Sequence, residues 1–262
     1  MSPILTLLIT LLAIITTTTT AHPTPPSCPP TIGPKAVHAR LPPALDPNYP
    51  HTKWHAPPPT WYLKPWHMIY ASNPQYTAFR NIQYDPSALD PHNPTLLNDL
   101  FSFQLPHNNT IHTTYGIDTL HPVYPGVLAY NATGIIAGAT SEYSILAWGC
   151  DANAVPYYAS YSTATGMTRT PAGIDVMSVS AAGVDGDTME AVMGALAGLE
   201  SLEVGRLVEG LVRMVDDGGR EGLPRVSLRE SFLRRVLQVQ SESYWAVGLM
   251  FPFWKPGFQF IW

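Results

Sequence analysis

The chain has 262 residues, a formal net charge of −5, and 45% hydrophobic against 13% charged residues. That much apolar material is enough for a sizeable core, and the slight acidic excess excludes the basic footprint of a protein that binds nucleic acid. Its aromatic residues include 7 Trp and 13 Tyr, side chains that often line apolar cavities.

The first segment has the pattern of a targeting signal. An apolar run over residues 4–15 is interrupted only by Thr6 and Thr10, and Ala21 supplies a small residue for cleavage. The run is too short for a transmembrane helix. We therefore predict a signal peptide over residues 1–21, and a protein that is secreted or resides in the endoplasmic reticulum or secretory pathway.

A proline-rich arm follows over residues 22–57, within a stretch from 22 to 65 that holds 14 of the 27 prolines. Proline lacks a backbone donor and fixes φ, so the arm is expected to be irregular. It contains Cys28, and the only other cysteine is Cys150. In an oxidising compartment these two predict one disulfide, and the sequons at Asn108 and Asn131 predict glycosylation.

Short segments rich in aromatic and β-branched residues then run from residue 61 to residue 180, bounded by Pro, Gly, Asn or Asp. Eight such segments with short turns are typical of a small antiparallel barrel with room for one ligand. The fold class is therefore predicted as all-β, with the barrel domain over residues 58–215. The expected strands are 61–70, 76–84, 97–105, 110–117, 125–130, 143–150, 157–163 and 172–180.

The hydrophobic period changes at the end of this region. Asp187 and Glu190 have the spacing of a helix-capping pair, and Met189, Val192 and Leu196 continue one apolar face. We therefore expect C-terminal α-helices packed on the barrel, followed by a C-terminal extension over residues 216–262.

The extension ends in an aromatic tail over residues 244–262, in which Lys255 is the only charged residue. Pro252 and Pro256 exclude a membrane-spanning helix in this tail. Three interpretations stay open. The tail packs over the barrel mouth or a sheet edge, contacts a membrane surface or a partner, or is disordered.

Three stretches resemble a known group: Pro59-Thr-Trp61-Tyr-Leu, Thr114-Tyr-Gly-Ile-Asp-Thr119 and Thr170-Pro-Ala-Gly-Ile-Asp-Val176. With them the chain resembles fungal secreted lipocalin-like proteins, which have a calycin-type barrel. In the lipocalin superfamily an early Gly-x-Trp motif plugs the base of the barrel, and Pro59-Thr60-Trp61 stands in that place. The resemblance implies an eight-stranded antiparallel lipocalin-like barrel with a hydrophobic cavity.

The strongest candidate for chemistry lies in the last hairpin of the barrel. A register that places Ala159 opposite Asp175 puts Tyr157 and Tyr161 on the same face. If that face lines the barrel, burial would raise the pKa of Asp175, which would act as the catalytic acid or base. The alternative is an Asp that faces solvent or bonds to a neighbouring Tyr. The residues predicted to bind ligand are Tyr115, Tyr143, Trp148, Tyr157 and Tyr161.

Other kinds of chemistry find little support. The sequence has neither a Gly-x-Ser-x-Gly elbow nor a phosphate-binding loop. Two cysteines without suitably spaced histidines do not make a zinc site, so we expect neither a metal nor a cofactor. His67 and His112 either face the cavity or serve the structure.

Three functions therefore remain open. The first is a secreted or lumenal protein that binds a small hydrophobic molecule in a barrel cavity. The second, implied by the resemblance, is a cofactor-free, pericyclase-like cyclase or isomerase acting on a hydrophobic intermediate of fungal secondary-metabolite biosynthesis. A third, a surface interaction protein, would use the aromatic tail. An enzyme should show a buried titratable group facing the cavity, whereas a carrier should show an almost wholly apolar lining.

Overall fold

The computed structural model describes residues 37–46, 54–223 and 225–227. The expected signal peptide, Cys28, the aromatic tail and most of the proline-rich arm lie outside these residues. The described strands and α-helices, in chain order, are β1 (Trp66–Ala71), β2 (Arg80–Tyr84), β3 (Ser87–Asp90), β4 (Asn93–Gln104), β5 (Ile111–Leu120), β6 (Val127–Ala132), β7 (Thr140–Cys150), β8 (Pro156–Ser162), β9 (Gly173–Ser178), α1 (Gly186–Ala197), α2 (Leu202–Glu209), β10 (Val212–Arg213) and β11 (Arg225–Ser227).

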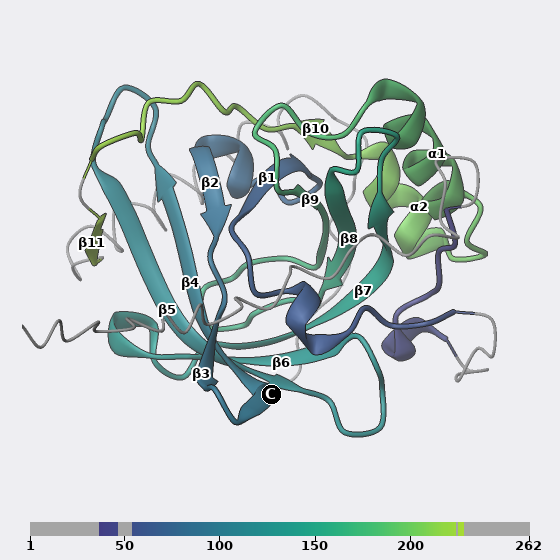
Figure 1. Ribbon diagram of the computed structural model, residues 1–262, viewed down its shortest axis with the longest axis horizontal. Coiled ribbons are helices and arrows are strands. Elements are labelled where there is room, and N and C mark those ends of the chain that lie inside the picture. Colours follow the sequence, from purple (N-terminus) through teal and green to yellow (C-terminus); the bar gives the residue numbers. More distant parts are fainter. Residues whose placement is uncertain (1–36, 47–53, 224, 228–262) are drawn as a thin grey trace, which may run out of the picture.

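Eight antiparallel strands close into a barrel (Figure 1), which confirms the predicted fold class. Each of β1, β2, β4, β5, β6, β7, β8 and β9 pairs with the next, and β9 returns to β1 with Met68 opposite Met177. The short β3 extends the hairpin with β4 below the barrel wall. Apart from β9 and β1, whose pairing closes the barrel, neighbouring strands therefore follow one another along the chain in an up-and-down arrangement.

The first expected strand was wrong in its initial part. Residues Pro59–Trp61 form a 3-10 helix, because Pro58 and Pro59 remove the donors that a strand ladder would need. β1 itself begins only at Trp66. A second 3-10 turn, Tyr76–Ala78, likewise occupies the start of the expected second strand.

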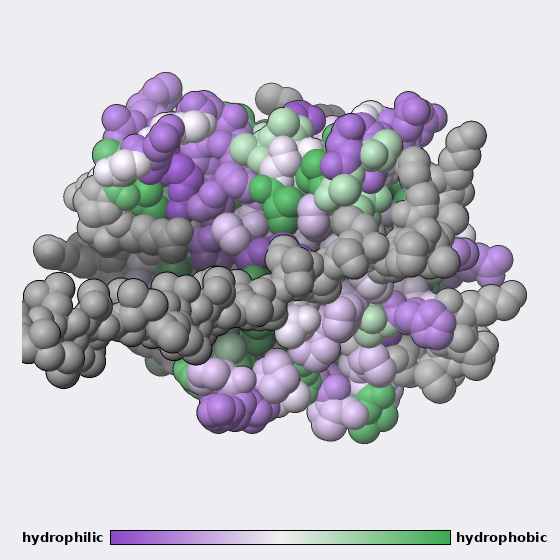
Figure 2. Space-filling model, in the orientation of Figure 1, coloured by the Kyte–Doolittle hydropathy of each residue, from purple (hydrophilic) through white to green (hydrophobic). Residues whose placement is uncertain are grey.

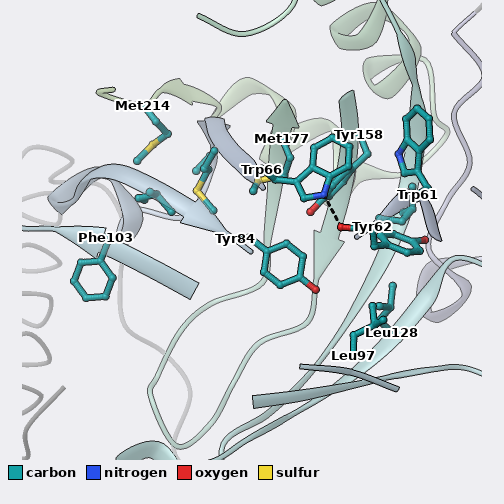
Figure 3. Packing of buried hydrophobic residues seen from close by; sticks show 14 of the residues in the cluster. Trp61, Tyr62, Trp66, Tyr84, Leu97, Phe103, Leu128, Tyr158, Met177 and Met214 are labelled. Carbon is teal, nitrogen blue, oxygen red and sulfur yellow. Dashed lines mark hydrogen bonds between the residues drawn. The ribbon is translucent and has the colours of Figure 1, made fainter. Parts of the chain in front are cut away.

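The 3-10 helix at Pro59–Trp61 and the residues that follow it bring a group of aromatic side chains to one end of the barrel (Figure 3). Trp61, Tyr62 and Trp66 are all fully buried. The Trp66 ring meets Tyr158 edge-on at a centroid distance of 4.7 Å, and its Nε1 donates to the Tyr62 carbonyl oxygen at 3.0 Å. Trp61 packs edge-on against Trp148 at 4.9 Å. This end of the barrel is therefore solid core, and Trp61 lies where the resemblance placed a base-plugging residue.

The helices cover the outer face of β7–β9 (Figure 1). The N-cap of α1 is Asp185, whose side chain accepts from the Thr188 N–H, and Asp187 falls inside the first turn rather than at the cap. Their buried apolar residues, Val192, Leu196, Val204 and Leu207, pack on outward side chains of the sheet. Within the described part of the chain, neither helix is long and apolar enough to cross a membrane.

After α2 the chain enters the barrel wall. We call residues 212–217 the wall segment, because they lie between β1 and β2 where those strands separate. β1 and β2 pair only at Trp66–Tyr84 and His67–Gln83. Beyond these two pairs the strands separate, and β10 pairs with the end of β1. The Met214 N–H donates to the Ile69 carbonyl at 2.8 Å, and Val215 forms an isolated β-bridge with Arg80. The segment thus supplies the missing backbone partners of both strands.

Side chains fasten the end of the wall segment to β1 and β2. Asp216 Oδ2 lies 2.7 Å from His67 Nδ1, and Asp217 accepts from both Arg80 and Asn81. The Asp217 N–H donates in return to Asn81 Oδ1 at 2.8 Å. These contacts extend the barrel across the expected domain boundary at residue 215.

The described surface is of mixed character. Figure 2 shows hydrophobic residues in small groups among hydrophilic ones on the face that it displays. The large exposed hydrophobic side chains include Leu89, Val123, Met167 and Leu202, which belong to different elements and loops. Single exposed hydrophobic residues of this kind need no functional explanation.

Candidate functional site

A cavity of about 220 Å³ lies at the end of the barrel opposite the tryptophan-filled end. Its walls come from β4 to β9 and from the loops 72–79, 133–139 and 163–172. The lining residues used below are Tyr76, Phe79, Asp99, Phe101, Phe103, Thr114, Tyr130, Tyr143, Gly173 and Asp175.

One wall of the cavity is aromatic. Phe79 stacks on Phe103 at a centroid distance of 4.0 Å, and Tyr76 lies 5.7 Å from Phe101. Phe101 and Phe103 alternate along β4 and so point to the same face of the strand. This wall offers a flat apolar surface to a bound molecule.

The rim of the cavity is held by hydrogen bonds between two loops. Gln75 donates to the Arg169 carbonyl at 3.1 Å and accepts from the Thr170 hydroxyl at 2.8 Å. Asn73 donates to the Pro171 carbonyl at 3.4 Å. The loop after β1 is therefore tied to the loop between β8 and β9, directly above the cavity.

Asp175 faces into this cavity from β9. The residue is only 7% exposed, and its Oδ1 has no hydrogen-bond partner among the described residues. Because burial disfavours the charged form, the pKa of Asp175 is raised to about 7. A carboxyl group in this position is partly protonated at neutral pH and can donate or accept a proton.

A second pair of buried carboxyl groups lies on β4 and β5. Asp99 pairs with Gly116 and Asp118 pairs with Leu97, so the two acids are diagonal neighbours on the inner face. Burial raises the pKa of both, and Asp118 raises that of Asp99 further. Two such acids cannot both ionise cheaply side by side, so Asp99 holds a proton and donates it to Asp118.

Two tyrosines stabilise the charge on Asp118. Its Oδ2 accepts from the Tyr84 hydroxyl at 2.6 Å and from the Tyr143 hydroxyl at 3.0 Å. Tyr130 lies opposite Asp118 on β6, and its ring covers Gly116, where any Cβ would collide with it. The glycine thus lets an aromatic ring lie flat beside the acid pair. Asp118 faces the closed end of the barrel, and Asp99 lines the cavity.

The predicted register of the last hairpin was wrong by one residue. Asp175 pairs with Ser160, and Ala159 pairs with Val176. Since successive residues of a strand point to opposite faces, Tyr157 and Tyr161 lie on the outer face rather than beside Asp175. Both pack beneath the helices, where Tyr161 donates to Glu203 at 2.7 Å. Asp175 nevertheless faces the barrel interior, and this is the orientation that its predicted role as an acid or base requires.

The other residues predicted to bind ligand divide between several places. Tyr143 lines the cavity. Tyr115 is 37% exposed on the outer face of β5, and Trp148 belongs to the closed end, where its Nε1 donates to the His55 carbonyl. Of the five, only Tyr143 is therefore in position to touch a molecule in this cavity.

Reasoning from the sequence missed the acid pair. A signal was present in β4, where Asp99 has the same parity as Leu97, Phe101 and Phe103, so an acid stood within an inward apolar row. The partner Asp118 is set by the register with β5, which the sequence does not reveal. The strand pairing alone places the two carboxyl groups together.

The remaining candidates have structural positions. His67 bonds to Asp216 on the outer face, and His112 lies against Phe103 at a ring distance of 5.8 Å, with burial lowering its pKa. Asn131 is exposed at the end of β6, and Asn108 lies in the loop after β4. Cys150 is buried at the end of β7. Among the described residues no three His, Cys, Asp or Glu side chains are grouped to hold a metal ion.

Comparison with known proteins gives one relative in sequence. The protein named Botcinic acid biosynthesis cluster B protein 12, from Botryotinia fuckeliana (strain B05.10), is 27% identical over 194 residues. The match covers 72% of this chain and 88% of the relative. No family model matches the sequence.

Solved structures with a similar arrangement include insecticyanin from the tobacco hornworm Manduca sexta and lobster apocrustacyanin A1. For insecticyanin the TM-score is 0.43 at 13% identity, and the match covers 64% of this chain and 85% of the insecticyanin chain. For apocrustacyanin A1 the TM-score is 0.42 at 12% identity, and the match covers 59% of this chain and 77% of the apocrustacyanin chain.

Strand order and closure identify the fold independently of these likenesses. Eight antiparallel strands follow one another around the wall, a 3-10 helix with a buried tryptophan closes one end, and a cavity occupies the other. Two helices follow the last barrel strand and pack outside it. By these features the chain folds as a closed eight-stranded antiparallel barrel with two helices packed outside it.

Proposed function

We propose that this chain binds a small, mainly hydrophobic molecule in its barrel cavity. The observation that carries the proposal is the cavity itself, which is enclosed by barrel strands, walled on one side by stacked aromatic rings, and set above a solid closed end. Apolar walls with a few placed polar groups are the usual form of a small-molecule site. The name of the Botryotinia relative supports a molecule from a biosynthetic pathway.

A larger side chain inside the cavity should weaken ligand binding. Thr114 points inward from β5 and lines the cavity, so Thr114→Phe is expected to weaken binding of methylnaphthalene by at least about tenfold, because the ring occupies the ligand's space. The measurement is a fluorescence titration. Thr119→Phe, on the outer face of the same strand, is the matched control and should bind like wild type. Equal binding by both variants would place the site elsewhere.

A second function is favoured by the polar part of the lining. A simple carrier was expected to have an almost wholly apolar cavity, but Asp175 and Asp99 are buried titratable groups that face it. We therefore propose, as the alternative, a cofactor-free cyclase or isomerase of secondary-metabolite biosynthesis, with Asp175 as the acid. Holding one reactive conformer and supplying one proton are the contributions that such a cavity can make.

The catalytic alternative predicts a loss of turnover in Asp175→Asn. Conversion of a pathway intermediate by this variant should fall by roughly 100-fold or more, since general acid catalysis contributes about that much. In the wild type the rate should decline as the pH rises above about 7, because the protonated form of Asp175 is then lost. Product formation followed by mass spectrometry gives the rates. Unchanged turnover would remove Asp175 from the mechanism and leave ligand binding as the function.

For the cellular location we propose the secretory route. The apolar run over residues 4–15, the two sequons and the two cysteines support it. Endoglycosidase treatment and non-reducing mass mapping of protein from the native host test glycosylation at Asn108 and Asn131 and the Cys28–Cys150 disulfide. We keep contact of the aromatic tail with a membrane surface as a proposal that a vesicle-binding assay would decide.

A further inference from the structure

The acid pair on β4 and β5 has two buried oxygens, Asp99 Oδ1 and Asp118 Oδ1, to which no N–H or O–H group of the described residues donates. Asp99 is only 8% exposed, and its Oδ1 accepts no hydrogen bond from an N–H or O–H group of the described residues. Asp175 Oδ1, on β9, is likewise buried and accepts no hydrogen bond from the described residues. A buried oxygen without a donor loses its hydrogen bonds to water, and this loss destabilises the folded protein. Such an oxygen therefore calls for an explanation, for example a bound molecule that donates to it.

Asp118 differs from Asp99 because two tyrosines donate to one of its oxygens, Oδ2, although its Oδ1 has no such donor. Tyr84 and Tyr143 both donate to Asp118, and Asp99 supplies a third donor. These donors stabilise Asp118 as the ionised member of the pair. Asp99 therefore shares its proton with Asp118, and because Asp99 is part of the cavity lining, its carboxyl group can also accept a hydrogen bond from a bound molecule.

The groups around the cavity cannot supply the missing donor in another way. No lysine, arginine or histidine is part of the described cavity lining. The titratable groups that face the pair are Tyr76 from the first loop, Tyr130 from β6, Tyr143 from β7 and Asp175 from β9. Of these hydroxyl groups, only that of Tyr143 bonds to the pair, and it bonds to Asp118. No described hydroxyl or N–H group donates to Asp99 Oδ1, so a bound molecule can supply a donor to this carboxyl group.

We propose that Asp99, held by Asp118, recognises a hydroxyl group on the bound molecule, so that the ligand is an apolar compound carrying a phenolic, enolic or alcoholic O–H. This inference rests on the proposed binding function and narrows its ligand class. The aromatic wall of Phe79, Phe101 and Phe103 takes the apolar body of the molecule, and the Asp99 oxygen takes the proton of its hydroxyl. Asp118 acts as a positioning residue that keeps the acceptor oxygen turned inward.

Three probes of nearly equal shape test the proposal on the wild-type protein. Naphthol carries a hydroxyl donor, methoxynaphthalene has an acceptor oxygen only, and methylnaphthalene has neither. We expect naphthol to bind about tenfold more tightly than the other two, as measured by fluorescence titration, because a hydrogen bond to a charge-linked acceptor contributes about that much. Equal affinity for all three would overturn the proposal, because water would then satisfy Asp99 equally well.

Two substitutions at the same position sharpen the test. Asp99→Leu removes the acceptor and should erase the preference for naphthol while methylnaphthalene still binds. Asp99→Asn can donate its N–H to Asp118 and turn its carbonyl oxygen to the cavity, so it should keep most of the preference. Asp187→Leu, at an exposed site in α1, is the control for an Asp→Leu change. Loss of the preference in Asp99→Asn would contradict an acceptor role.

The possible outcomes distinguish a failure of hydroxyl recognition from a failure of the proposed ligand-binding function. Binding of methylnaphthalene without any preference for naphthol rejects the hydroxyl recognition alone and leaves the hydrophobic cavity as a binding site. An equal preference for naphthol and methoxynaphthalene means that the wall donates rather than accepts, which overturns the assignment of Asp99. Failure of all three probes to bind rejects both the binding function and the inference. The wild-type comparison needs no variant to fold.

Discussion

At about pH 8, the Asp175→Asn variant is expected to be more stable than the wild type. The folded protein raises the pKa of Asp175 to about 7 from an ordinary value of about 4, because burial disfavours the carboxylate. Between these two values the folded state holds a proton that the unfolded state has released. The free energy of unfolding of the wild type therefore falls as the pH rises through this window, by about 4 kcal/mol from this group.

Asparagine has nearly the same shape and cannot ionise, so the variant lacks this part of the pH dependence. Urea unfolding between about pH 4 and pH 8 should show the two proteins close together in acid and separated at the alkaline end. Asp187→Asn serves as the surface control and should follow the wild type throughout. Parallel curves for Asp175→Asn and the wild type would mean that Asp175 is not buried in the cavity as described.

Trp66→Ala is expected to destabilise the protein by about 3–5 kcal/mol. The side chain is fully buried at the closed end, where it packs edge-on against Tyr158 and bonds to the Tyr62 carbonyl. Its removal leaves a large cavity among rings that are held by the barrel wall and cannot collapse inward. Urea or thermal unfolding measures the loss.

Two further variants test whether the loss of stability in Trp66→Ala comes from the packing of this side chain. Trp66→Phe keeps a ring in place and loses one hydrogen bond, so its loss should be roughly 1–2 kcal/mol. Tyr115→Ala, on the outer face, should change stability by less than about 1 kcal/mol. A Trp66→Ala loss no larger than that of Tyr115→Ala would show that the closed end is not packed as described.

Local patterns were sufficient to predict the eight barrel strands, although not where the first two begin. Alternating apolar residues such as Phe101 and Phe103 indicate a strand whatever it pairs with, and the spacing of Val192 and Leu196 indicates a helix in the same way. Faces were harder to predict. The predicted register of the hairpin around Asp175 was displaced by one residue, because the loop between β8 and β9 has its own Thr165–Thr170 bridge and starts one residue earlier than expected.

The acid pair could not be predicted for a different reason. Asp99 and Asp118 come together through the register of β4 with β5, and a shift of one residue in that register would place one of them outside the barrel. The same holds for the wall segment, because nothing near Met214 in the sequence indicates that its partner is Ile69. Contacts between distant parts of the chain depend on the whole topology, which local patterns do not contain.

The wall segment also sets the order in which the barrel can be completed. Asn81 and Asp217 are 136 residues apart, yet their hydrogen bond closes the gap between β1 and β2. During synthesis β2 emerges long before this partner, so its upper half must wait with unpaired backbone groups until α2 has been made. Closing so large a loop is entropically slow. We therefore expect barrel closure to be a late folding step, and a chain released before residue 212 to be a target for chaperones and proteases.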